Sequence, residues 1–592
     1  MRVQISDNKV TISAGGGTLP TKAGDITVTD PAVIIDSSVP GDGIVEVSGD
    51  IAGGIPAILA LVDEQQPGLL ATADLPLDLK ALSGVVDAGL VATVHLPAAD
   101  SGEAPSFDYV FNGNAKDFAS KEPIEKRMIS NGQLAFSASQ DGYQLGGTAD
   151  IDGIPAQVEI TGTPTTDPVF RLSSTVDVAG LAKMGFDAST FLSGSLRFVA
   201  QPMRDGSLKM AVDLENAGLD IKDLGIGKPA GTPGTVSASI RQNGDVTTLG
   251  DIALSFGTVR LEGALEFHAK DGLVAADFSR FALADGDNAQ VAVAPIRGGF
   301  AVRVRGSQLD LRPVLKRFFS IEEGRGGVQT EQFNQTISLD VQLERATGFY
   351  ATTAFKLGLD MLLSGSDMRR VNLTTTFSDA NSLSVTTNPA SEGRTLSVAF
   401  NDAGTILRFL GVYSRLVGGT GSMVLTTDGK QDVEAGQLLM RSFAIVDEDN
   451  VVQVLGNRSD SLASVAQSKR LDFDAAQVDF QRSSDRVQIT NAILTGPTVG
   501  GTLRGFIYTA QRQYDLTGTY VPLFGLNSVF QKIPLLGPIL GGRDGEGLVG
   551  VTFAVNGPLE NPQFRINPLS VLVPGVFREL FEFRAKALPA AQ

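Results

Sequence analysis

Apolar and polar residues alternate with a period of two along most of this chain, and this alternation limits what the chain can fold into. In the stretch TVRLEGALEFHAK, residues 258–270, every second residue from Val259 to Ala269 is apolar or glycine. The residues between them are mostly charged, among them Arg260 and Glu262. Successive side chains of a β-strand point to opposite faces, so the pattern predicts a strand with one apolar and one polar face.

The same pattern returns in stretches that are far apart in the sequence. Residues 132–151 predict two strands joined at Asp141-Gly142, because such pairs favour tight hairpins. Further Asp-Gly or Asn-Gly pairs begin at Asp205, Asn243, Asp271 and Asp428. We therefore expect a mainly β, mostly antiparallel fold.

Helical periodicity is confined to short segments. Apolar residues at three- and four-residue spacing predict helices over 55–64, 309–320 and 403–416, and over 526–533 and 573–588 nearer the end. Asp310 and Asp402 lie near two of the predicted starts, where a carboxylate caps free backbone N–H groups. The amphipathic segment 573–588 has two interpretations: a cap over the last strand edge, or a contact with a membrane or partner.

The number of strands excludes a single flat sheet. If about three-quarters of the 592 residues are strand and turn, at ~12 residues per strand, the chain holds roughly 35–40 strands. We expect strands of about five to seven residues, roughly 17–24 Å long. Because sheets beyond about ten strands curl, split or close, the chain forms either separate sandwiches or barrels, or a sheet curled lengthwise into a groove. The Val, Ala, Leu and Gly of the apolar positions, with no Trp, favour a lined groove.

Composition excludes several classes of function. The formal net charge of −18 argues against nucleic acid and against electrostatic attraction to an anionic membrane. The chain has no cysteine and two histidines, His95 and His268, which are far apart, so we expect no enzyme, no cofactor and no metal site. The first residues lack the pattern of a signal peptide and read as a strand, which suggests an incomplete chain or one that depends on an upstream segment.

Three sets of alternating apolar residues are candidate lining positions of a groove. On the residues alone, such positions are more often ordinary core. The set is Val259, Leu261, Leu265, Phe267, Phe300, Val302, Val304, Val549, Val551, Phe553 and Val555.

The last third of the chain resembles a known family. The stretches NDAGTILRFLGVYSRLVGGTGSM (401–423) and GEGLVGVTFAVNGPLENPQFRINPLSVLVPGVFRELFEF (545–583) resemble the C-terminal region of AsmA-like proteins, nearest to the YhdP-like branch. The resemblance is looser over 304–318 and 47–63. Its most specific positions are Asn561, Pro562, Asn567, Pro568, Leu569, Ser570, Pro574, Gly575, Phe577, Leu580 and Phe581.

This resemblance implies a bridge-like lipid transfer protein of the Gram-negative cell envelope. Such proteins are anchored in the inner membrane and cross the periplasm as a long β-groove that carries phospholipid toward the outer membrane, which supports outer-membrane biogenesis and lipid homeostasis. We then expect phospholipid acyl chains as partners, with membrane proteins at each end, and we expect the anchoring helix in a full-length form. The expected parts are an N-terminal groove (1–300), a middle segment (301–400) and an AsmA-like C-terminal region (401–592). The alternative is a structural or assembly factor for the outer membrane that carries no lipid.

Overall fold

The computed structural model describes most of the chain. The described residues are 1–39, 42–65, 81–97, 104–124, 127–163, 166–183, 187–203, 205–221, 226–268, 272–319, 335–364, 367–389, 393–427, 433–447, 470–483, 485–509, 511–522, 550–558 and 563–567. Strands account for 76% of the structure and helices for 7%, and the sheet does not close on itself. The expectation of a mainly β, open and curled sheet with a few short helices is confirmed.

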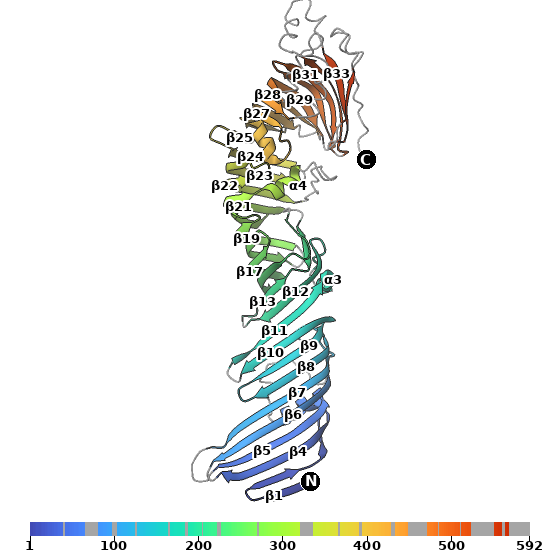
Figure 1. Cartoon of the computed structure of the whole chain (residues 1–592), viewed down its shortest axis with the longest axis vertical. Coiled ribbons are helices and arrows are strands. Elements are labelled where there is room, and N and C mark those ends of the chain that lie inside the picture. Colours follow the sequence, from blue (N-terminus) through green and yellow to red (C-terminus); the bar gives the residue numbers. More distant parts are fainter. Residues whose placement is uncertain are drawn as a thin grey trace, which may run out of the picture. The chain divides into compact units, whose positions relative to one another are not determined.

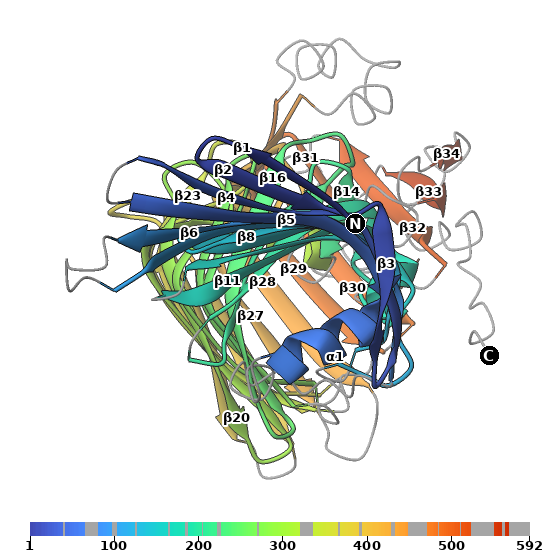
Figure 2. The same ribbon diagram turned by 90° about the horizontal axis from the view of Figure 1, so that it is seen from below.

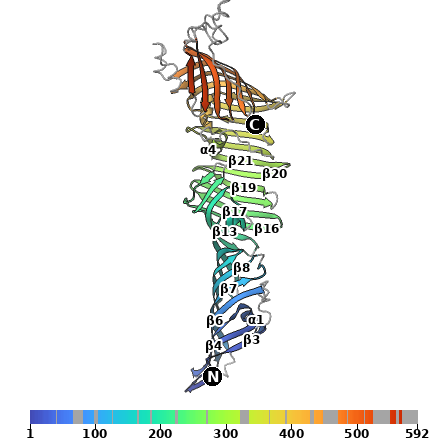
Figure 3. The same cartoon turned by 90° about the vertical axis from the view of Figure 1, so that its right-hand side faces the viewer.

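The chain divides into two units, which we describe separately. The N-terminal unit comprises Met1–Asp220 and Gly227–Gly257, and the C-terminal unit comprises Ile221–Ile226 and Thr258–Gln592. In each unit the strands follow one another largely in chain order, as the colour sequence in Figures 1 and 3 shows.

The first seventeen strands begin in the N-terminal part. They are β1 (Arg2–Ser6), β2 (Lys9–Ser13), β3 (Gly16–Thr21), β4 (Gly24–Val39), β5 (Asp42–Gly54), β6 (Leu82–Pro97), β7 (Ser106–Ser120), β8 (Ile129–Ser139), β9 (Gly142–Ile151), β10 (Ile154–Thr163), β11 (Thr166–Asp177), β12 (Leu192–Pro202), β13 (Leu208–Asp213), β14 (Ala217–Ile221), β15 (Ile226–Lys228), β16 (Gly234–Asn243) and β17 (Val246–Phe256). Its helices are α1 (Ile55–Gln65) and α3 (Val178–Lys183).

The remaining strands belong to the C-terminal unit. They are β18 (Val259–His268), β19 (Gly272–Ala282), β20 (Asn288–Ile296), β21 (Gly299–Asp310), β22 (Thr336–Thr347), β23 (Thr353–Ser364), β24 (Asp367–Thr376), β25 (Ser382–Pro389), β26 (Arg394–Phe400), β27 (Leu416–Thr427), β28 (Glu434–Val446), β29 (Arg470–Arg482), β30 (Arg486–Thr495), β31 (Val499–Tyr508), β32 (Gln513–Pro522), β33 (Val551–Pro558) and β34 (Gln563–Asn567). Its helices are α4 (Arg312–Phe319) and α5 (Ala403–Leu410).

Among the described residues, the following strand pairs of the N-terminal unit are all antiparallel. β1 pairs with β2 and β2 with β4, β3 pairs with the other half of β4, and consecutive strands then pair from β4 to β13. After β13 the chain leaves the main sheet: β14 pairs with the start of β12, and β16 returns to pair with β13 and β17.

Pairing in the C-terminal unit follows chain order from β18 to β34. All of these pairs are antiparallel except β21 and β22, which are parallel. A parallel pair requires a crossover that carries the chain back along the sheet, and α4 begins this connection.

The two edges of each sheet differ in their connections. Because antiparallel strands alternate in direction, the β5–β6 and β11–β12 connections of the N-terminal unit lie at the same edge, and these connections contain α1 and α3. In the C-terminal unit β21 and β26 also end at one edge, where α4 and α5 follow and contact each other. We call this the helix edge of each unit. The opposite hairpin edge carries short turns such as Gln140-Asp141 and Gly244-Asp245.

Several strands are much longer than expected, because bulges bend them without ending them. β4 and β6 have 16 residues each and β7 has 15, against the expected five to seven. The pairing register shifts at Gly84, Asp117 and Asn131 on the adjacent strands β6, β7 and β8, and all three have positive φ angles. A bulge increases local twist and bends a strand, so this line of bulges curves the sheet, with α1 on the concave side (Figure 2).

The helix predictions are confirmed in place and corrected at their ends. Residues 55–64 form most of α1. The segment 309–320 becomes helical only at Arg312, because Leu309 and Asp310 still pair with β22. The segment 403–416 ends its helix at Leu410, because Gly411 adopts the left-handed conformation of a helix C-cap. Predicted helices 526–533 and 573–588 lie outside the described residues, and α3 was not predicted.

Asp402 caps α5 and also ties it to the sheet. Its Oδ1 accepts a hydrogen bond from the backbone N–H of Thr405 at 2.9 Å, and its Oδ2 accepts one from the Thr405 hydroxyl at 2.7 Å. Asn381, in the β24–β25 connection, donates to the same Oδ2 at 2.9 Å. The cap predicted from the sequence at Asp402 is thereby confirmed.

We predict that Asp402→Ala destabilises the C-terminal unit by about 1–2 kcal/mol, because a capped helix start loses its acceptor. Urea unfolding followed by circular dichroism measures the shift of the midpoint. Asp379→Ala, at an exposed bend nearby, is the control and should leave the midpoint unchanged. Equal midpoints for both variants would contradict the capping role.

Lys228 closes the excursion between β13 and β16. Its side chain is almost completely buried, and its Nζ donates to the carbonyl oxygens of Leu214 and Ala217, each at 2.6 Å. Burial lowers the pKa of this ammonium, against the opposing effect of Asp213 and Glu215. The ammonium thus adds a second donor to the Leu214 carbonyl, which also accepts from the backbone N–H of Ala217, and supplies a donor to the Ala217 carbonyl.

Lys228→Met should lower the stability of the N-terminal unit by roughly 1–3 kcal/mol, since the variant removes the two buried hydrogen bonds that the ammonium makes. The matched control is Lys209→Met on the exposed face of β13. Thermal unfolding of both variants measures the difference. If they melt together, Lys228 does not hold this excursion in place.

Candidate functional site

One row of cross-strand neighbours crosses all the described strands of the C-terminal unit, and every residue in it is apolar or glycine. Each member is paired in register with the next, from β18 to β34. The row is Gly263, Phe278, Val291, Val304, Val341, Leu359, Leu373, Val385, Val398, Met423, Leu438, Val478, Ala492, Leu503, Gly518, Phe553 and Ile566. We call it the C-terminal apolar row.

The predicted lining residues lie on the same face as this row. Val304 and Phe553 are members of it. Leu265 belongs to the adjacent parallel row, which passes through Ala276, Val293 and Val302. The structure therefore joins segments that are far apart in the sequence through the register of the strands between them.

The other predicted positions divide by their burial. Val259, Leu261 and Val555 are buried, whereas the side chains of Phe267, Phe300 and Val551 are partly exposed. Val549 lies outside the described residues. So do the family-motif residues, except Asn567, which pairs with Thr552 at the end of β34.

The N-terminal unit has a row of the same kind. It crosses twelve strands from β3 to β16 in unbroken register. Its members are Leu19, Ile26, Gly53, Val86, Ala115, Leu134, Gly147, Val158, Leu172, Ala200, Met210 and Ala238. We call it the N-terminal apolar row, and its residues were not predicted from the sequence.

The opposite face of each sheet carries the charges. In the C-terminal unit Arg280 pairs with Glu262 at 3.1 Å and Arg370 with Asp360 at 2.9 Å, and Arg305 forms an ion pair with Asp340. The first two pairs are well exposed and the third is partly exposed, and exposed pairs contribute little to stability. These charged residues keep the outer face hydrated, and they make the two faces of the sheet differ clearly in polarity.

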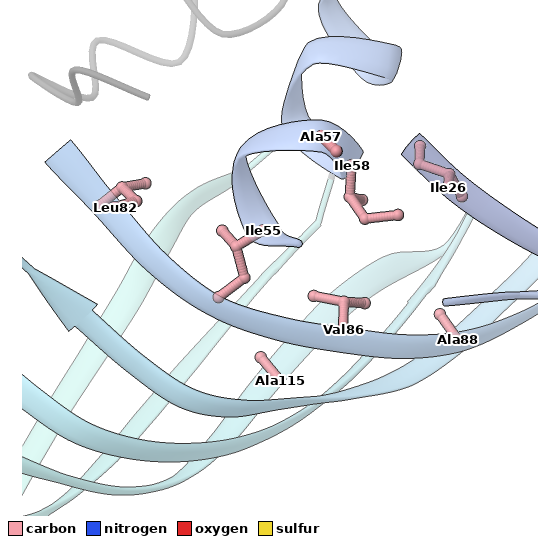
Figure 4. Close-up of a cluster of buried hydrophobic side chains, with 8 residues drawn as sticks. All are labelled: Ile26, Ile55, Ala57, Ile58, Leu82, Val86, Ala88 and Ala115. Carbon is pink, nitrogen blue, oxygen red and sulfur yellow. The ribbon is translucent and has the colours of Figure 1, made fainter. Parts of the chain in front are cut away.

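The apolar face is covered mainly near the helix edge. In the N-terminal unit Ile55 and Ile58 of α1 pack onto Val86 and Ala115 (Figure 4). In the C-terminal unit Leu407 of α5 packs against a cluster that contains Phe443 and Phe473, whose rings stack with centroids 5.0 Å apart. Away from these helices most members of the C-terminal row remain partly exposed, including Val385, Met423 and Leu438. A filled sandwich core would bury them.

Buried ionisable groups of the C-terminal unit lie at the helix edge and tie loops together. Asp287 accepts backbone hydrogen bonds from Leu283, Ala284 and Asp310, each at 2.9 Å. Burial raises the pKa of Asp287, and those hydrogen bonds oppose the rise. Asp310, predicted as a helix cap, accepts hydrogen bonds from the backbone N–H of Arg312 at 2.9 Å and from its guanidinium. These contacts anchor the start of α4.

The part of the chain that the structure describes contains no group of three or more acidic or histidine residues arranged to hold a metal ion. None of its helices has the length and apolar character needed to cross a membrane. In comparisons with known proteins, no family model and no curated protein matches this chain. The candidate functional site is therefore defined by geometry alone: the partly exposed apolar face of each sheet.

The face assignment predicts different effects for two neighbours on β25. Val385 lies on the apolar row and Thr386 on the exposed face. Val385→Asp should cost about 1–3 kcal/mol or more, because a carboxylate loses water in an apolar setting. Thr386→Asp should stay within about 0.5 kcal/mol of the parent. Urea unfolding of the two variants compares them, and similar losses would contradict the assignment of faces.

Proposed function

We propose that this protein is a bridge-like lipid transfer protein, in which phospholipid acyl chains lie on the apolar face of the curled sheet. The observation that carries the proposal is the C-terminal apolar row, which crosses seventeen strands without a polar side chain and stays partly exposed along much of its course. The resemblance of residues 401–423 and 545–583 to AsmA-like proteins, of the YhdP-like branch, supports the same assignment.

The energetics of an acyl chain suit such a surface. Each methylene removed from water contributes about 0.8 kcal/mol, so a chain of many methylenes prefers the sheet to the solvent. Neighbouring positions of the row are chemically alike, so moving by one strand changes the contacts little. A bound chain can then slide, and the polar headgroup can remain in water outside the groove.

The proposed setting follows from the resemblance. The protein would act in the periplasm of a Gram-negative cell, between the inner and outer membranes, with membrane proteins at both ends. We propose passive transfer down a gradient of lipid, with direction set by partners.

We predict lipid crosslinks on one face of β18. A photoreactive residue placed at Leu265, on the apolar face, should form phospholipid adducts when cells are irradiated. The same residue at Glu266, exposed on the other face, should form none. Mass spectrometry of the purified protein detects the adducts.

Two results would overturn the proposal. Adducts of equal yield at Leu265 and Glu266 would indicate labelling from bulk membrane. Crosslinks only to protein at Leu265, and at Val302 and Val304 on the same face, would favour the structural or assembly role.

A further inference from the structure

The apolar face of the N-terminal unit is covered on one half and open on the other. Ile26 and Ile35 lie on the same strand, β4, and on the same face of it, since their partners lead to Val86 and Val94 of β6. Ile26 is 0% exposed, and Ile35 is 40% exposed. The difference reflects α1, which covers the helix-edge half of the face.

Figure 4 shows the covered half. Ile55 and Ile58 of α1 point toward Val86 and the neighbouring side chains of the sheet. The sheet presents small residues beneath the helix, among them Ala88 and Ala115. These give room for a body as wide as a helix, about 10 Å across.

The open half lies along the hairpin edge and consists of two adjacent rows that cross β1, β2, β4, β5, β6 and β7. We call it the open lane. It comprises Ile5, Val10, Ile35, Val45, Val94 and Phe107, and beside them Val3, Ile12, Val33, Val47, Ala92 and Tyr109.

The open lane is free of charge and mostly bulky, and its side chains are exposed or partly exposed except that of Ala92, which is buried. Phe107 is 54% exposed, and its ring stacks on that of Tyr109 at a centroid distance of 5.7 Å. Branched and aromatic side chains occupy nearly all of the lane, so the space above it is shallower than the space above Ala88 and Ala115. A ligand thinner than a helix fits in that space.

The length and polarity of the lane indicate which kind of molecule binds along it. Six strands at about 4.8 Å spacing give a lane of roughly 24 Å. An acyl chain in a bilayer extends about 15 Å, half of the ~30 Å hydrocarbon thickness, so the lane can hold a whole chain. A peptide strand laid flat on the lane would bring its backbone N–H and C=O groups onto a surface without hydrogen-bonding partners. Each group buried without a partner would cost free energy.

We infer that in the N-terminal unit acyl chains bind along the open lane at the hairpin edge, and that α1 is a fixed wall that excludes them from the other half. This inference rests on the proposed function and adds the path within this unit. It makes Ile35, Val94 and Phe107 positioning residues for lipid, whereas Ile26 and Val86 are structural.

The test uses two isoleucines of β4 as a matched pair. A leucine-sized diazirine residue replaces Ile35 or Ile26 in the full chain, and each protein is irradiated with vesicles of phosphatidylethanolamine and phosphatidylglycerol. We expect phospholipid adducts at Ile35 and at least tenfold fewer at Ile26. Circular dichroism checks that both variants fold, and Leu96, which is 40% exposed on the same face of β6, replaces Ile35 if that variant does not.

Each outcome separates the two proposals. Adducts at Leu265 of the C-terminal unit with none at Ile35 or Leu96 would overturn the open lane and leave the proposed function intact. Equal adducts at Ile26 and Ile35 would show that α1 is not a wall. Protein crosslinks in place of lipid at Ile35 would make the lane a docking surface for another chain. Absence of lipid from all of these positions would remove both proposals.

Discussion

The register in which neighbouring strands pair is the constraint on which the rest of this structure depends. Side chains alternate between faces with a period of two, so a slip of one residue in any pair would move a whole strand's apolar set to the polar face. Seventeen strands keep Val304, Leu438 and Phe553 on one face only because every intervening register agrees. Where a strand carries an extra residue, a bulge absorbs it, as at Asp117 between Lys116 and Phe118.

The same constraint explains which features could be predicted from the sequence. Alternation is local, so the two faces of β18 and β21 and the start of α5 at Asp402 were readable from the residues. The conformations of Asp117 and Asn131, both at positive φ, depend on neighbouring strands and gave no clear signal. Strand length was therefore underestimated, because a bulge looks like an interruption in the alternating pattern.

The candidate site was predicted only in part, because it is a property of pairing between distant segments. Leu265 and Val302 are 37 positions apart in the sequence yet belong to one row through Ala276 and Val293. The open lane was not predicted, since Ile26 and Ile35 look alike in the sequence and differ only in what α1 covers. The short helix α3 was missed as well, although Asp177 caps it by accepting a hydrogen bond from the backbone N–H of Gly180 at 2.8 Å.

The parallel pair β21–β22 has a topological consequence for the C-terminal unit. In a purely antiparallel meander, the strand five places after β21 would end at the opposite edge, and α5 would then lie across the sheet from α4. The crossover that begins with α4 reverses the direction that every later strand would otherwise have. As a result α5 lies at the same edge as α4. One reversal of direction thus keeps the bulky connections on one edge and leaves the other edge with short turns. An insertion of two antiparallel strands would preserve this division of edges, whereas an insertion of one strand would require another crossover.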